Sequence, residues 1–291
     1  MPLTHTRSFR VRYYECDAFG HLNNANYLRY MQETAFDASA AAGYGLDRYA
    51  QMGCHWLIRE TDIEFLRPVW YGETVEIKTW VMDFFRVRSR RAYESYLAGT
   101  DTPVAKALTD WVFVDTKTNL PVTIPQTFAQ AFYPEGLPSK FPSREATPES
   151  PGPPAGVFRM QRQVTWQDID NAHHVNNANY LNYVEECGMQ VIAAYGWPIQ
   201  RMLAEGVAIL IRRHQIQYLR PAVLDDELVI STWVSDVRRS TAVRHYTIHR
   251  VRDNALLTRV HSLGVWVDLA SQRPVRIPEQ MLADFAPNIA D

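Results

Sequence analysis

This chain of 291 residues has few cysteines, no long hydrophobic run and almost no net charge. Its three cysteines, Cys16, Cys54 and Cys187, are odd in number and far apart, so they indicate no disulfide framework and fit a reducing compartment. The longest aliphatic run, residues 207–211, is far shorter than the ~20 residues that span a bilayer. Residues 1–15 contain no apolar segment typical of a signal peptide. We therefore expect a cytoplasmic protein that does not associate with membranes.

The balance of charge excludes further classes. Lys and Arg total 30 against 32 Asp and Glu, which gives a net charge of −2. A nucleic-acid-binding protein usually has a strong basic excess, so no nucleic-acid partner is expected. The sequence has no glycine-rich phosphate loop, and its His and Cys spacings match no zinc site, so we expect neither a metal nor another cofactor. With 46% apolar residues, the chain can fill sizeable hydrophobic cores.

What the chain does contain is an internal duplication. The segment DAFGHLNNANYLRYMQE, which starts at Asp17, recurs as DNAHHVNNANYLNYVEE from Asp170, 153 residues later. The same offset relates IRETDIEFLRP to IRRHQIQYLRP, VEIKTWVMD to LVISTWVSD, and VFVDTKTNLPVTIP to VWVDLASQRPVRIP. A fixed period of this kind indicates two copies of one structural unit.

The repeat divides the chain into three parts. We expect one domain over residues 1–125, a linker over 126–157 and a second domain over 158–291. Because proline fixes φ and lacks a backbone donor, the proline-rich linker is expected to be extended. Each copy shows a β-rich run, a polar loop, an amphipathic helix and four more β-rich runs, which indicates an α+β fold. The expected elements are strands 9–15 and 160–167, helices 25–42 and 178–195, and, in the first copy, strands 56–66, 74–83, 86–97 and 104–115.

The loop before the first helix carries a known pattern. Arg10 and Val11, followed after four residues by the run CDAFGH that ends at His21, resemble the signature of the 4-hydroxybenzoyl-CoA thioesterase family. The run FLRPVWYGE at residues 65–73 is similar to a further landmark of that family. The second copy resembles the same signature through Asp170, His174, Asn176, Asn177 and the run LRP at residues 219–221.

The second copy also differs from this signature. Its loop is similar to that of the plant acyl-ACP thioesterases, which are double hot-dog proteins. However, Ile169 replaces Cys16, and His173 replaces Gly20. A side chain in place of that glycine is expected to alter the turn or obstruct the substrate, so we expect the Asp17 site to be the more active one.

The resemblance implies the hot-dog fold, in which a mainly antiparallel sheet wraps around a central helix. Because a single hot-dog domain normally pairs, the two copies are expected to pack as an intramolecular pseudo-dimer with an active cleft at each seam. Assembly of two chains into a homodimer is left open. The implied activity is hydrolysis of an acyl thioester to a free acid and a thiol, with acyl-CoA favoured over acyl-ACP as the substrate.

Asp17 and Asp170 are the expected catalytic residues. A carboxylate shortly before a helix can act on a carbonyl held at the helix N-terminus, either as a nucleophile or as a general base for water. Free amides of the first helical turn would hold the oxyanion. The alternative is that each Asp only forms a loop cap or Asx turn. His21 and His174 join the catalytic set as groups that orient the substrate or polarise its carbonyl, although they can equally hold the loop by hydrogen bonds.

Further residues are expected to bind the substrate. The asparagines among them are most simply helix N-caps, and the tyrosines are alternatively core or pocket-wall side chains. The expected substrate-binding residues are Gly20, Asn23, Asn176, Tyr27 and Tyr180.

Several other polar residues are weaker candidates. Glu33 and Glu186 lie at matching helix positions, but a solvated Glu is the commoner case. Cys16 is discounted as a nucleophile, because the carboxylate next to it raises its pKa. CoA phosphates would meet surface arginines, and the candidates are Arg88, Arg90, Arg91, Arg238, Arg239 and Arg244.

Two other functions compete with thioester hydrolysis. One is a hot-dog acyl-CoA hydratase or dehydratase, which needs an acid and base pair suited to removing a proton beside the carbonyl. The other is a non-catalytic acyl-CoA-binding module. The acidic loop present in both copies favours the thioesterase, and release of free thiol separates it from both alternatives.

Overall fold

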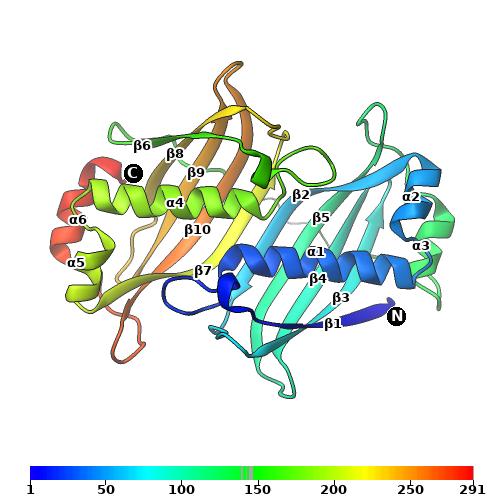
Figure 1. The fold of residues 1–291 in the computed structure, drawn as a ribbon, viewed down its shortest axis with the longest axis horizontal. Coiled ribbons are helices and arrows are strands. Elements are labelled where there is room, and N and C mark those ends of the chain that lie inside the picture. The colour runs from blue at the N-terminus through cyan, green and yellow to red at the C-terminus, as the bar shows by residue number, and fades with distance from the viewer. Residues whose placement is uncertain (139, 142, 144–146, 291) are drawn as a thin grey trace. The chain divides into compact units, whose positions relative to one another are not determined.

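The computed structural model describes residues 1–138, 140–141, 143 and 147–290. They form two compact units, Met1–Ala146 and Thr147–Asp291, each of which contains one copy of the repeat. In each unit one long helix lies across a sheet (Figure 1).

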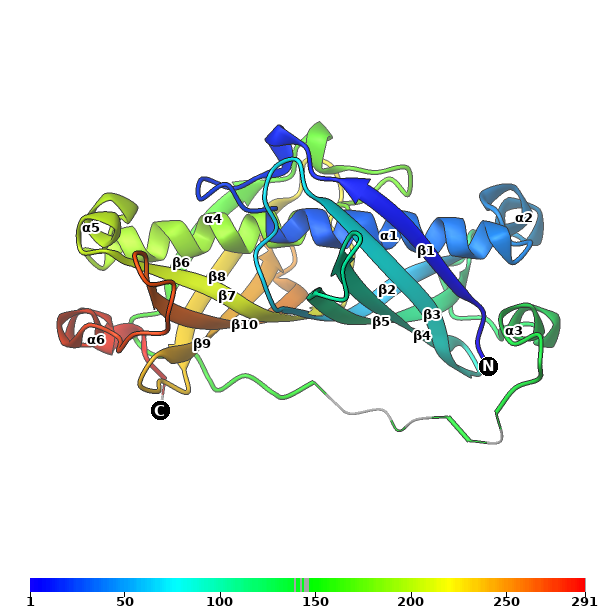
Figure 2. The ribbon, with the colours of Figure 1, turned by 90° about the horizontal axis from the view of Figure 1, so that it is seen from below.

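The described part of the first unit contains five strands, which pair in the order β1-β3-β4-β5-β2 and are antiparallel throughout. The long helix α1 (Asn24–Ala41) packs against β1 and β3. The sheet curves around one side of this helix (Figure 2). The other elements are β1 (Thr4–Arg10), a 3-10 turn (Tyr13–Glu15), α2 (Leu46–Met52), β2 (Cys54–Phe65), β3 (Thr74–Phe85), β4 (Arg88–Leu97), β5 (Pro103–Asp115) and α3 (Gln126–Phe132).

The second unit repeats this plan within its described residues. Its strands pair in the order β6-β8-β9-β10-β7, again antiparallel, and α4 (Asn179–Ala194) packs against β6 and β8. The other elements are β6 (Phe158–Gln163), a 3-10 turn (Trp166–Asp168), α5 (Ile199–Ala204), β7 (Val207–Tyr218), β8 (Glu227–Ser235), β9 (Thr241–Arg250), β10 (Ala255–Asp268), α6 (Glu279–Phe285) and a 3-10 turn (Ala286–Asn288).

Side-chain periodicity explains the central elements. In α1 the residues Tyr27, Leu28, Met31, Ala35 and Ala38 follow the 3–4 spacing of one helix face, and all five are buried. The strand β3 alternates buried residues with more exposed ones along its length. The expected α+β class and the expected central helices are therefore confirmed, with ends shifted by only one residue.

The first strand of each copy ends earlier than the sequence predicts. The sequence predicts strands over 9–15 and 160–167, but β1 ends at Arg10 and β6 ends at Gln163. An acidic side chain causes each early end. The carboxylate of Glu15 accepts the amide of Arg12 at 2.9 Å, and that of Asp168 accepts the amide of Thr165 at 2.8 Å. Each bond closes a 3-10 turn, which an extended strand cannot contain.

The expected linker is also not extended throughout. Residues 126–132 form α3, and Phe128 and Phe132 of this helix are buried in the first unit. In the second unit, α6 occupies the equivalent place in the repeat. Within the linker's proline-rich part, Ser150 Oγ lies 2.7 Å from His261 Nε2 of β10. This part of the chain runs along the side of the sheet away from α4 (Figure 2).

Candidate active site

Asp17 lies in a tight loop between the first 3-10 turn and α1. Its Oδ1 accepts hydrogen bonds from the amides of Phe19 (2.9 Å) and His21 (3.0 Å), and its own amide donates to the His21 carbonyl at 2.7 Å. The amide of Gly20 donates to the Asp17 carbonyl at 3.0 Å, with Gly20 at φ +84°. Asp17 thus forms the Asx turn that was the alternative interpretation. The same bonds fix the direction of its half-buried carboxylate, which a catalytic role also requires.

The second loop keeps this geometry despite its changed sequence. The Oδ1 atom of Asp170 accepts the amide of Ala172 at 2.9 Å, and the Asp170 amide donates to the His174 carbonyl at 3.1 Å. His173 donates its amide to the Asp170 carbonyl at 2.9 Å and adopts φ +60°. The expectation that a side chain at this position alters the turn is therefore wrong. His173 takes up the left-handed conformation at a strain of roughly 1–3 kcal/mol.

Asn23 caps α1, as predicted, whereas Asn176 caps the turn that leads into α4, a helix that begins only at Asn179. The Oδ1 of Asn23 accepts the amide of Ala25 at 2.9 Å, and the Oδ1 of Asn176 accepts that of Ala178 at 3.0 Å. In the second copy the Nδ2 of Asn176 also donates to Oδ2 of Asp170 at 3.1 Å. One side chain thus holds the Asp170 carboxylate beside the start of α4.

Sequence reasoning missed a buried support under the first loop. The carbonyl of Glu15 accepts the amide of Asn23 (2.9 Å) and the Nδ2 of Asn26 (2.8 Å), which ties the 3-10 turn to the first turn of α1. The buried Glu15 carboxylate accepts the hydroxyl of Tyr30 at 2.5 Å. Burial and this bond to an acid raise the pKa of Tyr30 well above its ordinary value. The hydroxyl therefore stays protonated as a donor to the carboxylate.

The second copy has the same support with a shorter acid. The carbonyl of Asp168 accepts the amide of Asn176 (2.9 Å) and the Nδ2 of Asn179 (3.0 Å). Burial acts to raise the pKa of Asp168, but bonds from Thr165 and the charge of Arg162 leave it below its ordinary value. The repeat itself could have revealed both supports, because the helix asparagine is identical in the two copies and an acid precedes both loops.

The two histidines hold their loops through backbone groups only. Their carbonyls accept the amides of Asp17 and Asp170, as described above. The ring of His21 lies edge-on to Trp70, with ring centroids 4.4 Å apart. Among the residues that the structure describes, neither imidazole has a hydrogen-bond partner.

Tyr27 and Tyr180 lie behind the loops in the hydrophobic cores, each only 2% exposed. Tyr27 packs on Phe65 with ring centroids 5.3 Å apart, and the Tyr180 hydroxyl accepts the amide of Ala222 at 3.1 Å. Burial raises the pKa of both tyrosines, that of Tyr180 to about 12. Both tyrosines are therefore core side chains, and their role as substrate contacts stays a prediction.

The weaker candidates lie outside the loops. The side chain of Glu33 is 55% exposed and pairs with Arg7 at 3.3 Å, and the exposed Glu186 accepts Nε2 of Gln190 at 2.8 Å. Both glutamates thus belong to solvated helix faces. Burial is the main cause that raises the pKa of Cys16, and the acidic groups beside it add to the effect. A raised pKa disfavours the thiolate, which agrees with the rejection of Cys16 as a nucleophile.

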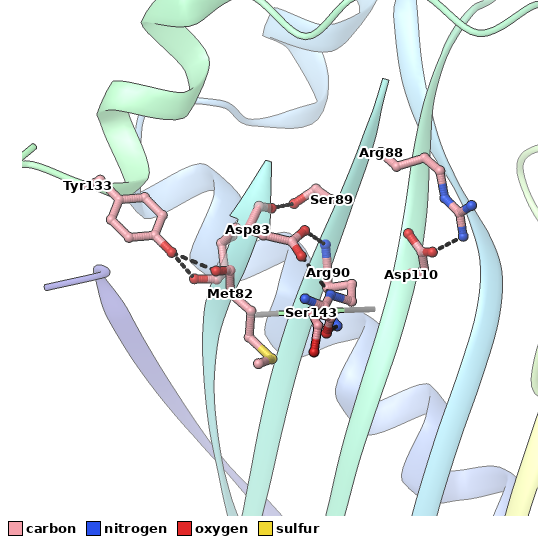
Figure 3. A network of polar contacts seen from close by, with 9 residues as sticks. Met82, Asp83, Arg88, Ser89, Arg90, Asp110, Tyr133 and Ser143 are labelled. Atoms are coloured by element: carbon pink, nitrogen blue, oxygen red, sulfur yellow. Dashed lines mark hydrogen bonds and ion pairs between the residues drawn. The ribbon is translucent and has the colours of Figure 1, made fainter. Parts of the chain in front are cut away.

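Two of the candidate phosphate-binding arginines are occupied within the first unit (Figure 3). Arg88 forms an ion pair with Asp110. Arg90 pairs with Asp83 at 2.6 Å and also donates to the carbonyl of Ser143 at 2.8 Å. These contacts join β3, β4 and β5 to the segment that follows α3.

The remaining arginines divide by burial. Arg91 is only 7% exposed, and burial lowers the pKa of both Arg91 and Arg244. Arg238 and Arg239 are exposed in the connection between β8 and β9. Of the six candidates, only these last two remain as surface groups for a CoA phosphate.

Among the described residues, no group of three His, Cys, Asp or Glu side chains is placed so that it could hold a metal ion. Likewise, none of the described helices combines the length and the apolar character needed to cross a membrane.

The fold and the loops together define a tandem hot-dog protein with an acidic loop at the start of each central helix. The chain belongs to the thioesterase-like superfamily, whose profile matches residues 11–132 and 164–285, one match for each copy of the repeat. The reaction class of the chain is accordingly thioester hydrolysis.

Two relatives agree with this membership, and a solved structure shares the fold. The chain is 30% identical to the acyl-CoA thioester hydrolase YbgC of Escherichia coli over 129 residues, 44% of this chain and 96% of the relative. It is 24% identical to the chloroplastic acyl-acyl-carrier-protein hydrolase FATB2 of Cuphea viscosissima over 193 residues, 63% of this chain and 47% of the plant protein. A crystal structure of a protein from Lactobacillus plantarum, proposed to be an oleoyl thioesterase, shares the fold with a TM-score of 0.78. It is 17% identical, and the match covers 96% of this chain and 98% of that one.

Proposed function

We propose that the chain hydrolyses acyl-CoA thioesters, with Asp17 and Asp170 as the reacting carboxylates. The observation that carries this proposal is the repeated loop, which fixes a half-buried carboxylate next to the start of a long helix. The choice of acyl-CoA over acyl-ACP is supported by the higher identity to the relative named for acyl-CoA. We also propose the cytoplasm, where acyl-CoA thioesters are available as substrates, as the site of action.

Two routes use the carboxylate. As a general base, it removes a proton from water, and the water oxygen attacks the thioester carbonyl carbon. The tetrahedral intermediate then expels the thiolate, which takes up the proton, and the products are the free acid and the thiol. As a nucleophile, the carboxylate attacks the carbonyl carbon itself and expels the thiolate, and water then hydrolyses the resulting anhydride.

The start of each helix supplies the group for the developing oxyanion. The first amides of a helix have no intrahelical acceptor. In the first copy, Asn23 satisfies two of them, through its side chain to Ala25 and through its carbonyl to Asn26 at 2.9 Å. The amide of Asn24 is the one that we assign to the oxyanion, and that of Asn177 has the same place in the second copy. The helix dipole adds to the stabilisation of negative charge there.

The experiment is replacement of both carboxylates by amides. The double variant Asp17→Asn with Asp170→Asn should lower kcat for thiol release from acyl-CoA by about 1000-fold, on the order of 4 kcal/mol in barrier. Asparagine forms Asx turns as readily as aspartate, so the loops should keep their shape. The two single variants, assayed on the same substrate, then report each site separately.

Asp115→Asn is the matched control. The Oδ1 of Asp115 also accepts amides of a tight turn, those of Lys117 (3.0 Å) and Thr118 (2.8 Å), but this turn follows β5. This variant should keep wild-type turnover. Near-normal turnover in the double variant would remove the carboxylates from the mechanism. Formation of an enoyl product without free thiol would support the hydratase alternative, and binding without turnover would support a non-catalytic module.

A further inference from the structure

Four large aromatic side chains are exposed beside the Asp17 loop. Their exposed fractions are 80% for Tyr13, 77% for Tyr14, 42% for Trp70 and 56% for Tyr71. We call these four residues the aromatic surface. An exposed patch of this kind usually marks a place where a ligand or another molecule binds, because aromatic side chains gain much from being covered.

Backbone and ring contacts bring the aromatic surface together. Two backbone hydrogen bonds, of 2.8 and 3.0 Å, join Val11 to Glu73 and Gly72, so the two chain segments that carry the four rings lie side by side. The rings of Tyr13 and Tyr71 meet edge to face, with centres 5.7 Å apart and planes at 87°. Two exposed rings at right angles form a corner, in which a flat ring system can stack on one ring and contact the edge of the other.

Trp70 connects this corner to the Asp17 loop. Its ring centre lies 4.4 Å from that of His21, and a Cβ added to Gly20 would meet the Trp70 ring at 3.6 Å. Tyr71 follows Trp70 directly in the chain, so the corner adjoins the loop that carries the proposed reacting carboxylate. A substrate whose thioester lies at Asp17 can therefore place another of its parts on the aromatic surface.

Basic side chains border the corner. The guanidinium of Arg10 lies beside Gly72, with Nη2 3.8 Å from the position of a Cβ added to that glycine. Among the described residues, no carboxylate pairs with Arg10, whereas Arg12 pairs at 3.3 Å with the buried acid of its own turn. The carboxylate of Glu73 is engaged, since it accepts the amide of Trp70 at 2.8 Å. Arg10 thus offers a positive charge next to the corner, which suits a phosphate.

The second unit lacks this combination of residues. At the repeat offset, only Tyr13 keeps an aromatic counterpart, Trp166, while both arginines are lost and an acid is gained. The counterparts of Arg10, Arg12, Tyr14, Trp70, Tyr71 and Gly72 are Gln163, Thr165, Gln167, Val223, Leu224 and Asp225. Because both units have the same fold, the fold does not require the aromatic and basic side chains. They are explained better by a ligand of the first site.

We propose that the aromatic surface binds the adenine nucleotide of a CoA thioester, with the base in the corner of Tyr13 and Tyr71 and a phosphate on Arg10. This inference rests on the proposed hydrolysis of acyl-CoA and names the part of the substrate that the first site recognises. Nucleic-acid bases stack on aromatic side chains, and a guanidinium binds phosphate through paired donors. An acyl carrier protein presents its thioester without a nucleotide, so this surface favours CoA as the carrier.

Titration with adenosine 3′,5′-bisphosphate tests the surface without any turnover. Calorimetry of the full chain should show one tightly bound nucleotide per chain. The double variant Tyr71→Leu with Arg10→Gln copies the second unit and should weaken this binding about tenfold. The matched control is Phe85→Leu with Arg86→Gln, which removes an exposed aromatic and an exposed arginine at the far end of β3, roughly 40 Å along the strand. The control should bind the nucleotide normally.

Kinetics in an Asp170→Asn background, where only the first site can react, give a second readout. The double variant should raise KM for acyl-CoA about tenfold and leave kcat within about twofold. The KM for the matching acyl thioester of N-acetylcysteamine, which has no nucleotide, should stay unchanged. If neither thioester released thiol, the proposed function of the first site would fail, and the nucleotide titration would still decide the present inference.

Unchanged nucleotide affinity in the double variant, or an equal rise in KM for both thioesters, would overturn the proposal. A rise in KM for acyl-ACP, with none for acyl-CoA, would overturn it in favour of a surface that docks the carrier protein. Sedimentation with phosphatidylglycerol vesicles covers the remaining occupant. If the double variant lost vesicle binding and kept its nucleotide affinity, the aromatic surface would belong to a lipid contact instead.

Discussion

His173 adopts a backbone conformation that glycine adopts at the same place in the first copy. The φ angles are +60° and +84°, and the turn closes with the same hydrogen bond in both loops. The substitution therefore changes the side chain above the loop and leaves its backbone path intact. Histidine is among the residues that tolerate the left-handed region better than most. The expected superiority of the Asp17 site now rests only on obstruction by the imidazole.

Replacing His173 by glycine tests that obstruction. In an Asp17→Asn background, where only the second site can react, His173→Gly should raise kcat for acyl-CoA by severalfold. Glycine removes the backbone strain of the folded loop, which stabilises it, but it also gives the unfolded chain more conformational entropy, which opposes folding. Because the two effects nearly cancel, the free energy of unfolding should change by no more than about 1 kcal/mol. Thiol release and guanidinium unfolding measure the two effects.

The control for this change is Gln272→Gly, in the turn that follows β10. Gln272 is also left-handed, with φ +55°, so its replacement releases similar strain far from either loop. It should leave turnover unchanged. A fall in kcat after His173→Gly would instead show that the imidazole assists the second site.

At the scale of the element, α3 shows where the first domain ends. Phe128 is 3% exposed, and its ring centre lies 4.5 Å from that of Tyr44 and 5.0 Å from that of Phe132. A helix that buries such a ring in the first unit belongs to the domain and not to a linker. Truncation of the ring would leave a cavity as well as a loss of buried area.

Phe128→Ala should therefore lower the free energy of unfolding by about 3–5 kcal/mol, measured by denaturant titration. Leu120→Ala is the control, since Leu120 is 64% exposed and its truncation should cost less than about 0.5 kcal/mol. If both variants lost the same small amount of unfolding free energy, residues 126–132 would belong to the linker, as the sequence predicts.

The regular elements were predictable because they depend on periodic burial. The central helices and the last four strands of the first copy follow patterns of 3.6 and 2 residues, and a local pattern determines them. The early ends of β1 and β6 depend instead on one acid that caps a 3-10 turn. The α3 helix was hidden because prolines precede and follow a short apolar run, which predicts an extended linker.

The candidate site divides in the same way. Asp17, Asp170 and the capping asparagines were found because a motif repeats at a fixed offset. The contact between Glu15 and Tyr30 joins two residues on different elements, and only the packing of the 3-10 turn on α1 brings them together. The repeat shows that an acid precedes both loops, but it does not predict which side chain of the helix that acid contacts.

Strand β7 has a buried imidazole where the first copy has Thr61. His214 is 5% exposed, its Nδ1 lies 2.8 Å from Oγ of Ser262, and burial lowers its pKa to about 3. Above the ordinary His pKa of about 6.5, the group is neutral in both the folded and the unfolded chain. Below it, the unfolded chain binds a proton that the folded chain refuses. Stability should therefore fall as the pH drops from about 6.5 toward the folded pKa.

His214→Thr, which copies the first unit, should reduce this loss. Between pH 6.5 and 5.5 the wild type should lose roughly 1 kcal/mol more unfolding free energy than the variant. Urea titrations at the two pH values measure the difference. If both proteins lost the same unfolding free energy between pH 6.5 and 5.5, His214 would have to take up its proton in the folded state.

At the scale of the whole molecule, the prediction that remains is the intramolecular pseudo-dimer. Within its own unit, each sheet ends in a strand of 12 residues, β2 in the first and β7 in the second. A long edge strand in a protein that stays monomeric usually needs cover. Duplication of the unit within one chain offers a partner at high effective concentration, which the linker length sets.

Cleavage of the linker separates this prediction from two independent domains. A protease site inserted after Gly136 lies in an exposed turn whose backbone has room, so the insertion should leave both units folded. After cutting, the halves should elute together from a sizing column at the size of the intact chain and should retain acyl-CoA hydrolysis. The cut would then cost no activity, because shared surfaces and not the linker hold the halves together. Halves that elute separately at half size would show that the linker was the only connection.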